Sequence, residues 1–484
     1  MKKLLSFVCF LLCVSLLFSC GKKQDPNEYD HAADFTEEDG ELYATVPTDR
    51  FGGATFRILN AKTGAISSKL DSESVNGDNL NEALFRRNSN VEERLDVNIE
   101  EERDTPENIS DKARSACLAG DTSYSAVCNS SDRMATLAVS GYLVSSEYLT
   151  GVNLSKPWWN AEAIDATVVG TDKYFFYGDL QLSYYDAHSM VGVNMDMVED
   201  INGISDPYEL VKEGKWTLDE MLKMMRAAAY DVDGNGKLNT DDRYGAAVDS
   251  SSVLSLVIGC DTAMFSKNDV GMPQMDCLGN DKFYDVFTFI SESFFQRQEY
   301  IYNVDLHQDE KISAGDMFAE GKSMFYITTV GSLYSLQSME YEFGVLPMPK
   351  YTEYQKEYVS YLNPEKATAI GAISTGRNYL RTGIVLENLA AESHRESGLR
   401  DCYVDTVLSF RYVDDAKSRE SLATVLETGT FDLGDIYGWG NIAQSVRSLA
   451  GDDDTFVSTI SASELKTLSD IRETFQELES IRYE

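Results

Sequence analysis

Residues 231–242, DVDGNGKLNTDD, form the most specific chemical pattern in the chain. Acidic or amide side chains stand at the first, third, fifth, ninth and twelfth positions, and a glycine at the sixth position allows a sharp turn. This is the pattern of an EF-hand calcium loop. The predicted Ca²⁺ ligands are Asp231, Asp233, Asn235, the backbone carbonyl of Lys237, and Asp242, which replaces the usual glutamate. The alternative is an Asx-rich turn that binds no metal.

The segments around this loop predict a structural role for the metal. An amphipathic helix is expected before it, up to residue 230, but RYGAAVDS after it alternates like a strand, and no second calcium loop occurs. A solitary loop does not open a hydrophobic groove as calcium sensors do. We therefore expect Ca²⁺ to fix the helix-to-strand connection, with a dissociation constant on the order of 10⁻⁴ to 10⁻³ M.

Motifs typical of catalytic sites are mostly missing. The four histidines form no HExxH motif, and GKS at 321–323 lacks the earlier glycine of a phosphate loop. Neither GxSxG nor GxGxxG occurs. Paired carboxylates for glycoside hydrolysis stay open, because the spacing that matters for them is three-dimensional. The sequence predicts a protein that is not an enzyme.

Composition excludes some partners. The net charge is -38, from 42 basic and 80 acidic residues, and it opposes binding to nucleic acids and to anionic lipid headgroups. The 43% of hydrophobic residues is enough for a large core. Five cysteines remain beyond the first twenty residues, with no CxxC motif, which favours buried free thiols over disulfides or a zinc site.

The N-terminus predicts secretion. Residues 1–19 combine two lysines with a short apolar run, as in a signal peptide, and LFSC at 17–20 resembles the lipobox of bacterial lipoproteins. We expect Cys20 to carry a lipid anchor that includes palmitate, and residues 20–50 to be a flexible tether. The alternative is an ordinary signal peptide with Cys20 as a bystander. The anchor would be the chain's only contact with the membrane, at its extracellular face.

The remaining chain, from about residue 51, predicts α/β architecture. Strand, helix, strand, helix and strand patterns follow one another over 54–59, 79–95, 97–102, 109–118 and 123–129. Extended segments are expected at 173–179 and 189–198. The chain is mostly helical over 378–412, and a helix over 463–481 closes it.

Aromatic residues are frequent, with 27 tyrosines and four tryptophans. Aromatic faces stack on the C–H faces of sugar rings, although most such residues belong to hydrophobic cores. Trp216 is expected to be structural, and Trp158 and Trp159 stay open. Trp439, between glycines in GDIYGWGN, is the candidate for an exposed aromatic.

Several phrases together resemble the extracellular solute-binding lipoproteins of bacterial ABC importers, in the family 1 group of maltose-type carbohydrate binders. They include NLNEALFRRNSNVEERLDVNI (79–99), TDKYFFYGDLQLS (171–183), GKWTLDEMLKM (214–224), FAEGKSMFYITTVGSL (318–333) and GWGN (438–441). The resemblance implies a two-lobed α/β fold with a ligand cleft between the lobes. Lobe I is expected to comprise 51–180 plus about 365–420. Lobe II is expected to comprise 181–364 plus about 421–484, including the calcium-like loop.

The resemblance also implies where a solute would bind. The loop after the strand SAVCN, the first crossover after YFFYGD, the turn after MFYIT and a late aromatic correspond to ligand contacts in the family. The implied ligand-binding residues are Asn129, Ser130, Asp132, Arg133, Tyr184, Tyr185, Asp186, Ser332, Tyr334 and Trp439.

The function implied is capture of a small solute and its delivery to ABC permease subunits by a monomeric receptor. Aromatic and amide residues favour a sugar or oligosaccharide, and the acidic composition argues for a neutral one. Peptide and polyamine binders share the architecture. The alternatives are a surface lipoprotein that binds polysaccharide and a glycoside-acting enzyme.

Overall fold

The computed structural model describes residues 42–63, 66–72, 78–375, 378–413 and 415–481. The chain divides into two compact units, Met1–Thr45 and Val46–Glu484. Only residues 42–45 of the first unit are described; the sheets and the helices around them belong to the second. The predicted signal peptide, the lipidation site at Cys20 and the tether up to residue 41 lie outside the described residues. Within the described ranges, no helix has both the length and the apolar character needed to cross a bilayer.

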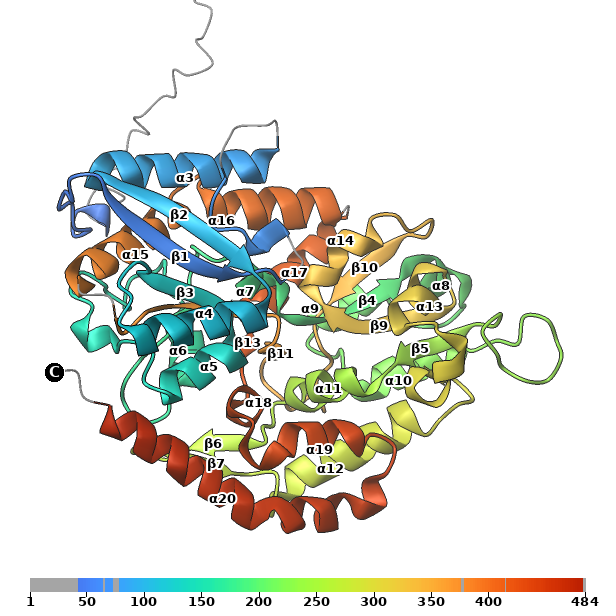
Figure 1. The fold of residues 1–484 in the computed structure, drawn as a ribbon. Coiled ribbons are helices and arrows are strands. Elements are labelled where there is room, and N and C mark those ends of the chain that lie inside the picture. Colours follow the sequence, from blue (N-terminus) through green and yellow to red (C-terminus); the bar gives the residue numbers. More distant parts are fainter. Residues whose placement is uncertain (1–41, 64–65, 73–77, 376–377, 414, 482–484) are drawn as a thin grey trace, which may run out of the picture. The chain divides into compact units, whose positions relative to one another are not determined.

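The first sheet has the strand order β12-β3-β1-β2 (Figure 1). Its strands are β1 (Ala54–Ala61), β2 (Val97–Asp104), β3 (Ala126–Ser130) and β12 (Thr368–Ala372). β1 pairs in parallel with both β2 and β3, whereas β12 is antiparallel to β3. Three strands from the start of the unit are therefore joined by one that is distant in sequence.

The second sheet has the order β10-β4-β9-β5-β8. Its strands are β4 (Ser189–Asn194), β5 (Tyr244–Val248), β8 (Ile301–Asn303), β9 (Ser323–Thr329) and β10 (Phe343–Leu346). β5 is parallel to β8 and β9, while β4 is antiparallel to β9 and β10. A separate hairpin is formed by β6 (Phe265–Lys267) and β7 (Pro273–Met275).

Two segments of chain connect the two sheets, and a third segment, which follows β12, pairs with one of them. The first runs into β4 through the short helix α7 (Ser183–Asp186). The second, β11 (Ser360–Tyr361), leads back to β12 and pairs in parallel with β13 (Gly429–Thr430) in the third. His188, directly before β4, bridges to Leu362 directly after β11. The connecting segments therefore contact one another.

Helices surround both sheets (Figure 1). The other α-helices are α3 (Asn79–Leu95), α4 (Pro106–Ala119), α5 (Ser131–Val139), α6 (Ala161–Thr167), α8 (Met195–Asp200), α9 (Pro207–Lys212), α10 (Leu218–Ala228), α11 (Val253–Gly259), α12 (Asp281–Ile290), α13 (Ala314–Ala319), α14 (Leu333–Leu336), α15 (Tyr379–His394), α16 (Leu399–Asp401), α17 (Ala416–Glu427), α18 (Leu433–Tyr437), α19 (Ile442–Ser448) and α20 (Phe456–Ser480). The 3₁₀ and π segments are η1 (Ile66–Ser68), η2 (Ser146–Tyr148), η3 (Ser250–Ser252), η4 (Ser291–Phe295), η5 (Val304–Leu306), η6 (Gln308–Glu310), η7 (Val330–Ser332), η8 (Cys402–Tyr412), η9 (Trp439–Asn441) and η10 (Asp453–Thr455).

Local sequence signals explain where the main helices begin. The Asp78 carboxylate accepts hydrogen bonds from the backbone N–H groups of Leu80 and Asn81 at the start of α3. The Thr217 hydroxyl accepts from the Glu220 N–H at the start of α10. Such caps satisfy N–H groups that have no partner within the helix.

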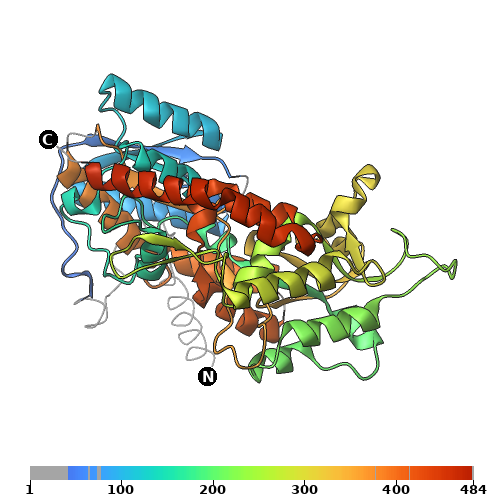
Figure 2. The same cartoon turned by 90° about the horizontal axis from the view of Figure 1, so that it is seen from below.

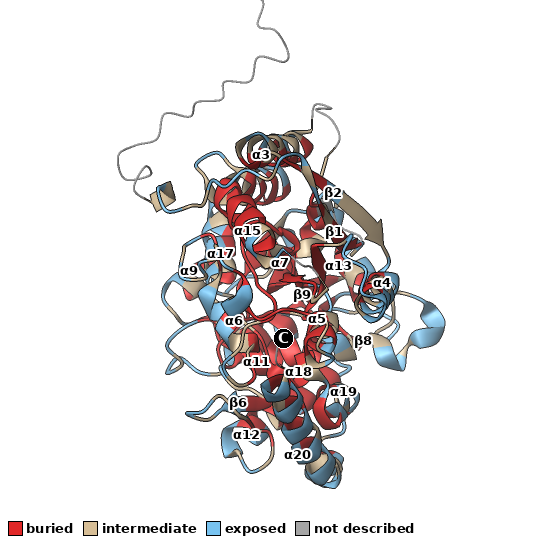
Figure 3. Cartoon of the chain, turned by 60° about the vertical axis from the view of Figure 1, so that its left-hand side comes forward, coloured by how far each residue is buried: buried red, intermediate tan, exposed pale blue. Residues whose placement is uncertain are grey.

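The long helix α20 contacts α19, its neighbour in sequence, and also the distant elements α5 and β7. Figure 2 shows it crossing the unit from the blue and teal part toward the yellow part. Buried residues gather in the strands and in the helix faces turned toward them, whereas α4 and α20 carry exposed outer faces (Figure 3). The five cysteines of the described chain are free thiols, as expected; Cys128, Cys260 and Cys277 are buried, whereas Cys117 and Cys402 are half-buried.

Candidate ligand-binding site

A cavity of about 1020 Å³ opens where segments of the two sheets meet. One part of its lining comes from the ends of β1 and β2, from η1 and from the start of α4. Another part comes from η7 and α14, which follow β9. The connecting segments add α7 and residues 365–366, and η8 completes the lining. Because β1 and β2 are parallel, their carboxyl ends lie at the same edge of the sheet, and both arrowheads point toward the middle of the unit (Figure 1). This volume accommodates a small solute.

A buried carboxylate, that of Asp186 in α7, lies in the cavity wall. The hydroxyls of Ser67 and Tyr403 each donate a hydrogen bond to one of its oxygens. Burial raises the pKa of Asp186 to about 6, although these two hydroxyls and the nearby Lys366 favour the charged form. Gly331 lies close by: a Cβ there would be 3.2 Å from the Cβ of Asp186.

Cationic side chains outnumber acidic ones in the lining. Among the described residues that line the cavity, the acidic ones are Asp186 and Glu365, and the cationic ones are Lys62, Lys69, Arg103 and Lys366. The guanidinium of Arg103 donates to the Ser68 hydroxyl over 2.7 Å, and its Nε lies 3.3 Å from the Glu101 carboxylate. The Lys366 ammonium donates to the Thr329 hydroxyl over 3.1 Å.

Two tyrosines add aromatic surface to the cavity. Tyr334 in α14 and Tyr412 in η8 stand edge to face, with ring centroids 6.0 Å apart. Tyr334 is 66% exposed, so its ring is available to a solute. An aromatic edge beside serine and threonine hydroxyls suits a ligand with both apolar C–H faces and polar groups.

Of the ten predicted ligand residues, the structure brings three to the cavity: Asp186, Ser332 and Tyr334. Their neighbours Tyr184 and Tyr185 are not in its lining. The Tyr184 hydroxyl accepts from the Asn160 amide over 2.8 Å, and the Tyr185 hydroxyl donates to the Asp179 carboxylate over 2.5 Å. Both hydroxyls are therefore used within the protein.

The four residues predicted around β3 also lie outside the lining. The Asn129 amide donates to the Pro106 carbonyl and to the Ser110 hydroxyl, and Ser130 is buried before α5. Arg133, beside Asp132 in α5, pairs with Glu107. Pro106 itself lines the cavity, so Asn129 is one contact away from it.

The prediction that Trp439 is an exposed aromatic is wrong. Trp439 is 1% exposed, its indole N–H donates to the Thr474 hydroxyl over 2.9 Å, and its ring stacks on Tyr437 with centroids 5.0 Å apart. The adjacent glycine provides close packing: a Cβ at Gly440 would be 1.9 Å from the Thr467 hydroxyl oxygen of α20. Trp158, Trp159 and Trp216 are buried as well.

Several lining residues are not among the predicted ligand-binding residues. Lys62 and Arg103 stand at the ends of β1 and β2, and the rule that ligands bind at the carboxyl ends of parallel strands would have pointed to both. Ser67, Lys366 and Tyr403 carry no comparable local signal, because long-range packing brings them to the cavity.

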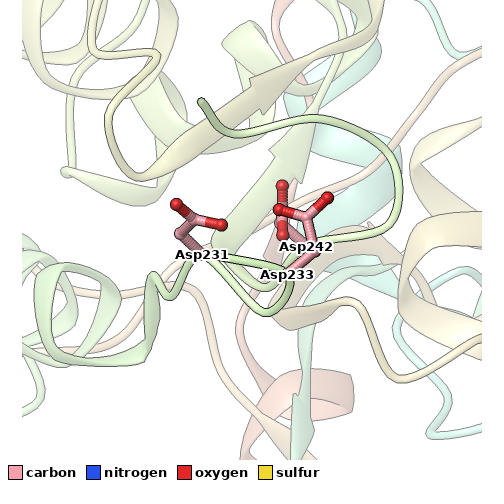
Figure 4. A group of neighbouring side chains, drawn as sticks. All are labelled: Asp231, Asp233 and Asp242. Atoms are coloured by element: carbon pink, nitrogen blue, oxygen red, sulfur yellow. The ribbon is translucent and has the colours of Figure 1, made fainter. Parts of the chain in front are cut away.

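The calcium-like loop connects α10 to β5 (Figure 4). Carboxylate oxygens of Asp231, Asp233 and Asp242 lie within 4.8 Å of one another, on the same side of the loop. Asp242 is buried and accepts hydrogen bonds from the N–H groups of Val232 and Asn239, both over 2.8 Å. Three carboxylates at this separation repel one another, and oxygen ligands of this kind fit Ca²⁺.

Asp231 and Asn235 orient the rest of this loop. Asp231 accepts from the N–H groups of Gly234 and Gly236, both over 2.7 Å, and these bonds, that from Gly236 foremost, lower the pKa of Asp231. The Asn235 side-chain oxygen accepts from the Lys237 N–H over 2.8 Å. The donor set therefore suits the predicted metal.

No protein-family model and no curated protein sequence matches the chain. Solved structures share its fold. A sugar transporter from Rhizobium etli in an open conformation is 10% identical, with a TM-score of 0.58, over 89% of this chain and 100% of that one. A cyclo/maltodextrin-binding protein complexed with maltotetraose is 12% identical, with a TM-score of 0.56, over 90% and 99% of the two chains.

The sugar-binding protein MalE from Xanthomonas citri is 13% identical, with a TM-score of 0.56, over 88% of this chain and 98% of that one. The chain has the fold of these sugar-binding proteins. The predicted fold class, a two-lobed α/β architecture, is therefore confirmed. Identities this low establish the fold alone, and the bounds predicted for the two lobes stay a prediction.

Proposed function

We propose that the protein is an extracellular solute-binding receptor that captures a sugar or oligosaccharide and delivers it to the permease of an ABC importer. The observation that carries this proposal is the cavity lined by segments that follow strands of both sheets and by the two segments that connect the sheets. Proteins of the same fold were solved with maltotriose, maltotetraose and mannotriose. A sugar in this cavity would contact both halves of the unit.

The proposed mechanism of capture follows from the contacts that the solute would make with both halves of the unit. A solute that binds one half through η1 and the other through η7 stabilises the arrangement in which both reach it. The two connecting segments would allow a hinge motion between the sheets. The permease would then distinguish loaded from empty receptor by that arrangement.

We also propose that the protein catalyses no reaction. Hydrolysis of a glycoside needs one carboxylic acid able to protonate the leaving oxygen and a second carboxylate across the bond. Both oxygens of Asp186 already accept hydrogen bonds from Ser67 and Tyr403. The other acidic group in the lining, Glu365, is exposed.

Calorimetry with a panel of solutes tests the receptor proposal. The panel should contain neutral and acidic oligosaccharides, short peptides and polyamines. We expect binding of at least one oligosaccharide with a 1:1 stoichiometry and no change in its mass after long incubation. Binding of peptides or polyamines alone would contradict the proposal, and a cleaved oligosaccharide would contradict the absence of catalysis.

The membrane anchor is a separate proposal. We propose that Cys20 is lipidated and holds the receptor at the outer face of the cell membrane, supported by the lipobox-like LFSC at 17–20. Cys20→Ala should release the protein into the medium with unchanged solute affinity. Retention of this variant in the membrane fraction would contradict lipid anchoring.

We further propose that residues 231–242 bind one structural Ca²⁺. Support comes from the three carboxylates within 4.8 Å of one another, one of them buried. Asp231, Asp233, Asn235, Asp242 and the carbonyl of Lys237 would hold the ion. It would neutralise their mutual repulsion and stabilise the connection between α10 and β5.

A further inference from the structure

The charge of the cavity is opposite to that of the chain. Acidic residues outnumber basic ones 80 to 42 in the sequence, whereas the described residues of the cavity lining include four cationic and two acidic side chains. A concave site lined by one sign of charge raises the local concentration of ions of the opposite sign. The cavity lining therefore has an excess of cationic side chains, of which Arg103 is paired with Glu101 and the three lysines form no ion pair in the described part of the chain.

The lysines of the cavity form no ion pair with a carboxylate of the described chain, a feature that they share with some lysines elsewhere, such as Lys212. Eight lysines elsewhere form ion pairs with carboxylates within 4.0 Å. In the described part of the chain, no such ion pair involves Lys62, Lys69 or Lys366. Lys69 reaches only the Asn81 side-chain oxygen, at 3.5 Å, and Lys366 reaches the Thr329 hydroxyl.

The surroundings of Lys366 also disfavour its positive charge. Lys366 is exposed within the cavity, yet the protein around it removes enough water to lower the pKa of its ammonium, against the attraction of the carboxylates of Asp186, Asp249 and Glu365. An ammonium in this situation gains stability when an anion binds beside it. In the described part of the chain Lys366 forms no ion pair within 4.0 Å, and the Asp186 carboxylate accepts its hydrogen bonds from Ser67 and Tyr403.

Tyr334 and Tyr412 add aromatic surface to the same cavity that contains the charged lysines. A ligand that satisfies both must combine apolar C–H faces with negative charge. We infer that the solute is an acidic sugar, an oligosaccharide whose rings carry anionic groups such as uronate carboxylates. This inference rests on the proposed receptor function, and it replaces the neutral sugar expected from overall composition.

The test is calorimetry of the full chain at low ionic strength with five probes: trigalacturonate, a sulfated galactan oligosaccharide, maltotriose, citrate and triglutamate. We expect one of the two acidic sugars to bind at least about tenfold more tightly than maltotriose, as charge-assisted hydrogen bonds imply. Which of them binds identifies the anionic group. The affinity of the protein for that acidic sugar should fall as the salt concentration rises from about 0.05 to about 0.5 M.

Variants connect that preference to the cavity. Lys62→Gln combined with Lys366→Gln should weaken binding of the acidic sugar about tenfold or more. Lys69→Gln alone serves if the double variant folds poorly. Lys212→Gln, which removes one exposed lysine from the end of α9, is the matched control and should change affinity less than about twofold.

The other outcomes of the five-probe experiment contradict the acidic-sugar inference, the receptor function or the assignment to this cavity. Binding of maltotriose as tight as that of both acidic sugars would overturn the inference and leave the receptor function intact. Binding of citrate or triglutamate without any sugar would overturn both, as would binding of none of the five. An acidic sugar whose affinity is unchanged in the lysine variants would overturn the assignment to this cavity.

Discussion

The Tyr403 hydroxyl donates a hydrogen bond to the buried Asp186 carboxylate, joining residues 217 positions apart in the chain. Asp186 belongs to the connecting segment that enters β4, and Tyr403 lies in the π-helical segment η8. A second hydroxyl, from Ser67 in η1, donates to the same carboxylate. One buried acid therefore holds three elements around the cavity.

Asp186 should make stability depend on pH. Its pKa is raised by burial to about 6 in the folded protein, against about 3.9 for an unfolded chain. The associated stability is fully present below about pH 4 and is lost as pH rises through about 6. Over that window the free energy of unfolding should fall by an amount on the order of 2–3 kcal/mol.

Asp186→Asn tests this pH dependence. Urea denaturation of wild type and variant at intervals between pH 4 and pH 7 gives the difference between their free energies of unfolding. The wild type should lose stability relative to the variant as pH rises. Asp432, whose pKa burial raises to about 7, acts in the same direction in both proteins and cancels. Parallel curves would contradict the role assigned to Asp186.

Tyr334→Ala should weaken solute binding about three- to tenfold, because the aromatic contact with the sugar is lost. Its ring is 66% exposed, so the free energy of unfolding should change by less than about 0.5 kcal/mol. Calorimetry and urea denaturation measure the two quantities. Tyr354→Ala, at a residue that is 96% exposed and outside the cavity lining, is the control. Equal affinity in both variants would exclude Tyr334 from the site.

Trp439→Ala should reduce stability by about 3–5 kcal/mol, the usual cost of removing a buried large aromatic. Solute affinity of the folded variant should stay within about twofold, because Trp439 lies outside the cavity lining and donates to Thr474 of α20. Trp439→Phe should retain part of the packing and cost less. A large loss of affinity with unchanged stability would instead place Trp439 at the solute.

Removal of Ca²⁺ should lower the melting temperature and leave solute affinity unchanged. Chelation should lower the melting temperature by a few degrees, and added millimolar Ca²⁺ should restore it. Asp242→Asn should abolish this response, because its buried carboxylate is one of the three in the loop. The neighbouring Asp241→Asn, at an exposed side chain, should retain it. A Ca²⁺-independent melting temperature in the wild type would exclude the metal.

Elements with local signals were predictable from the sequence. The helix expected at 79–95 coincides with α3, and the strand expected from residue 54 is β1, because hydrophobic periodicity and the Asp78 cap act over a few residues. The helical stretch expected at 378–412 is divided into α15, α16 and η8. Local patterns therefore predict where a helix lies better than where it is interrupted.

The cavity was less predictable because its residues come together through long-range packing. Asp186, Ser332 and Tyr334 follow from the positions of connections and strand ends, whereas Ser67 and Tyr403 meet Asp186 only in the folded chain. Trp439 was judged exposed from its flanking glycines. Gly440 instead allows close contact with α20, a reason for glycine that the sequence does not distinguish from a turn.

The place of β12 in the first sheet has a consequence for synthesis. β1, β2 and β3 leave the ribosome early, but β12 pairs with β3 only after residue 368 has emerged, later than all five strands of the second sheet. Until then β3 is an open edge that can pair with other chains. A nascent chain released or stalled before residue 368 should therefore be the form most prone to aggregation and most dependent on chaperones.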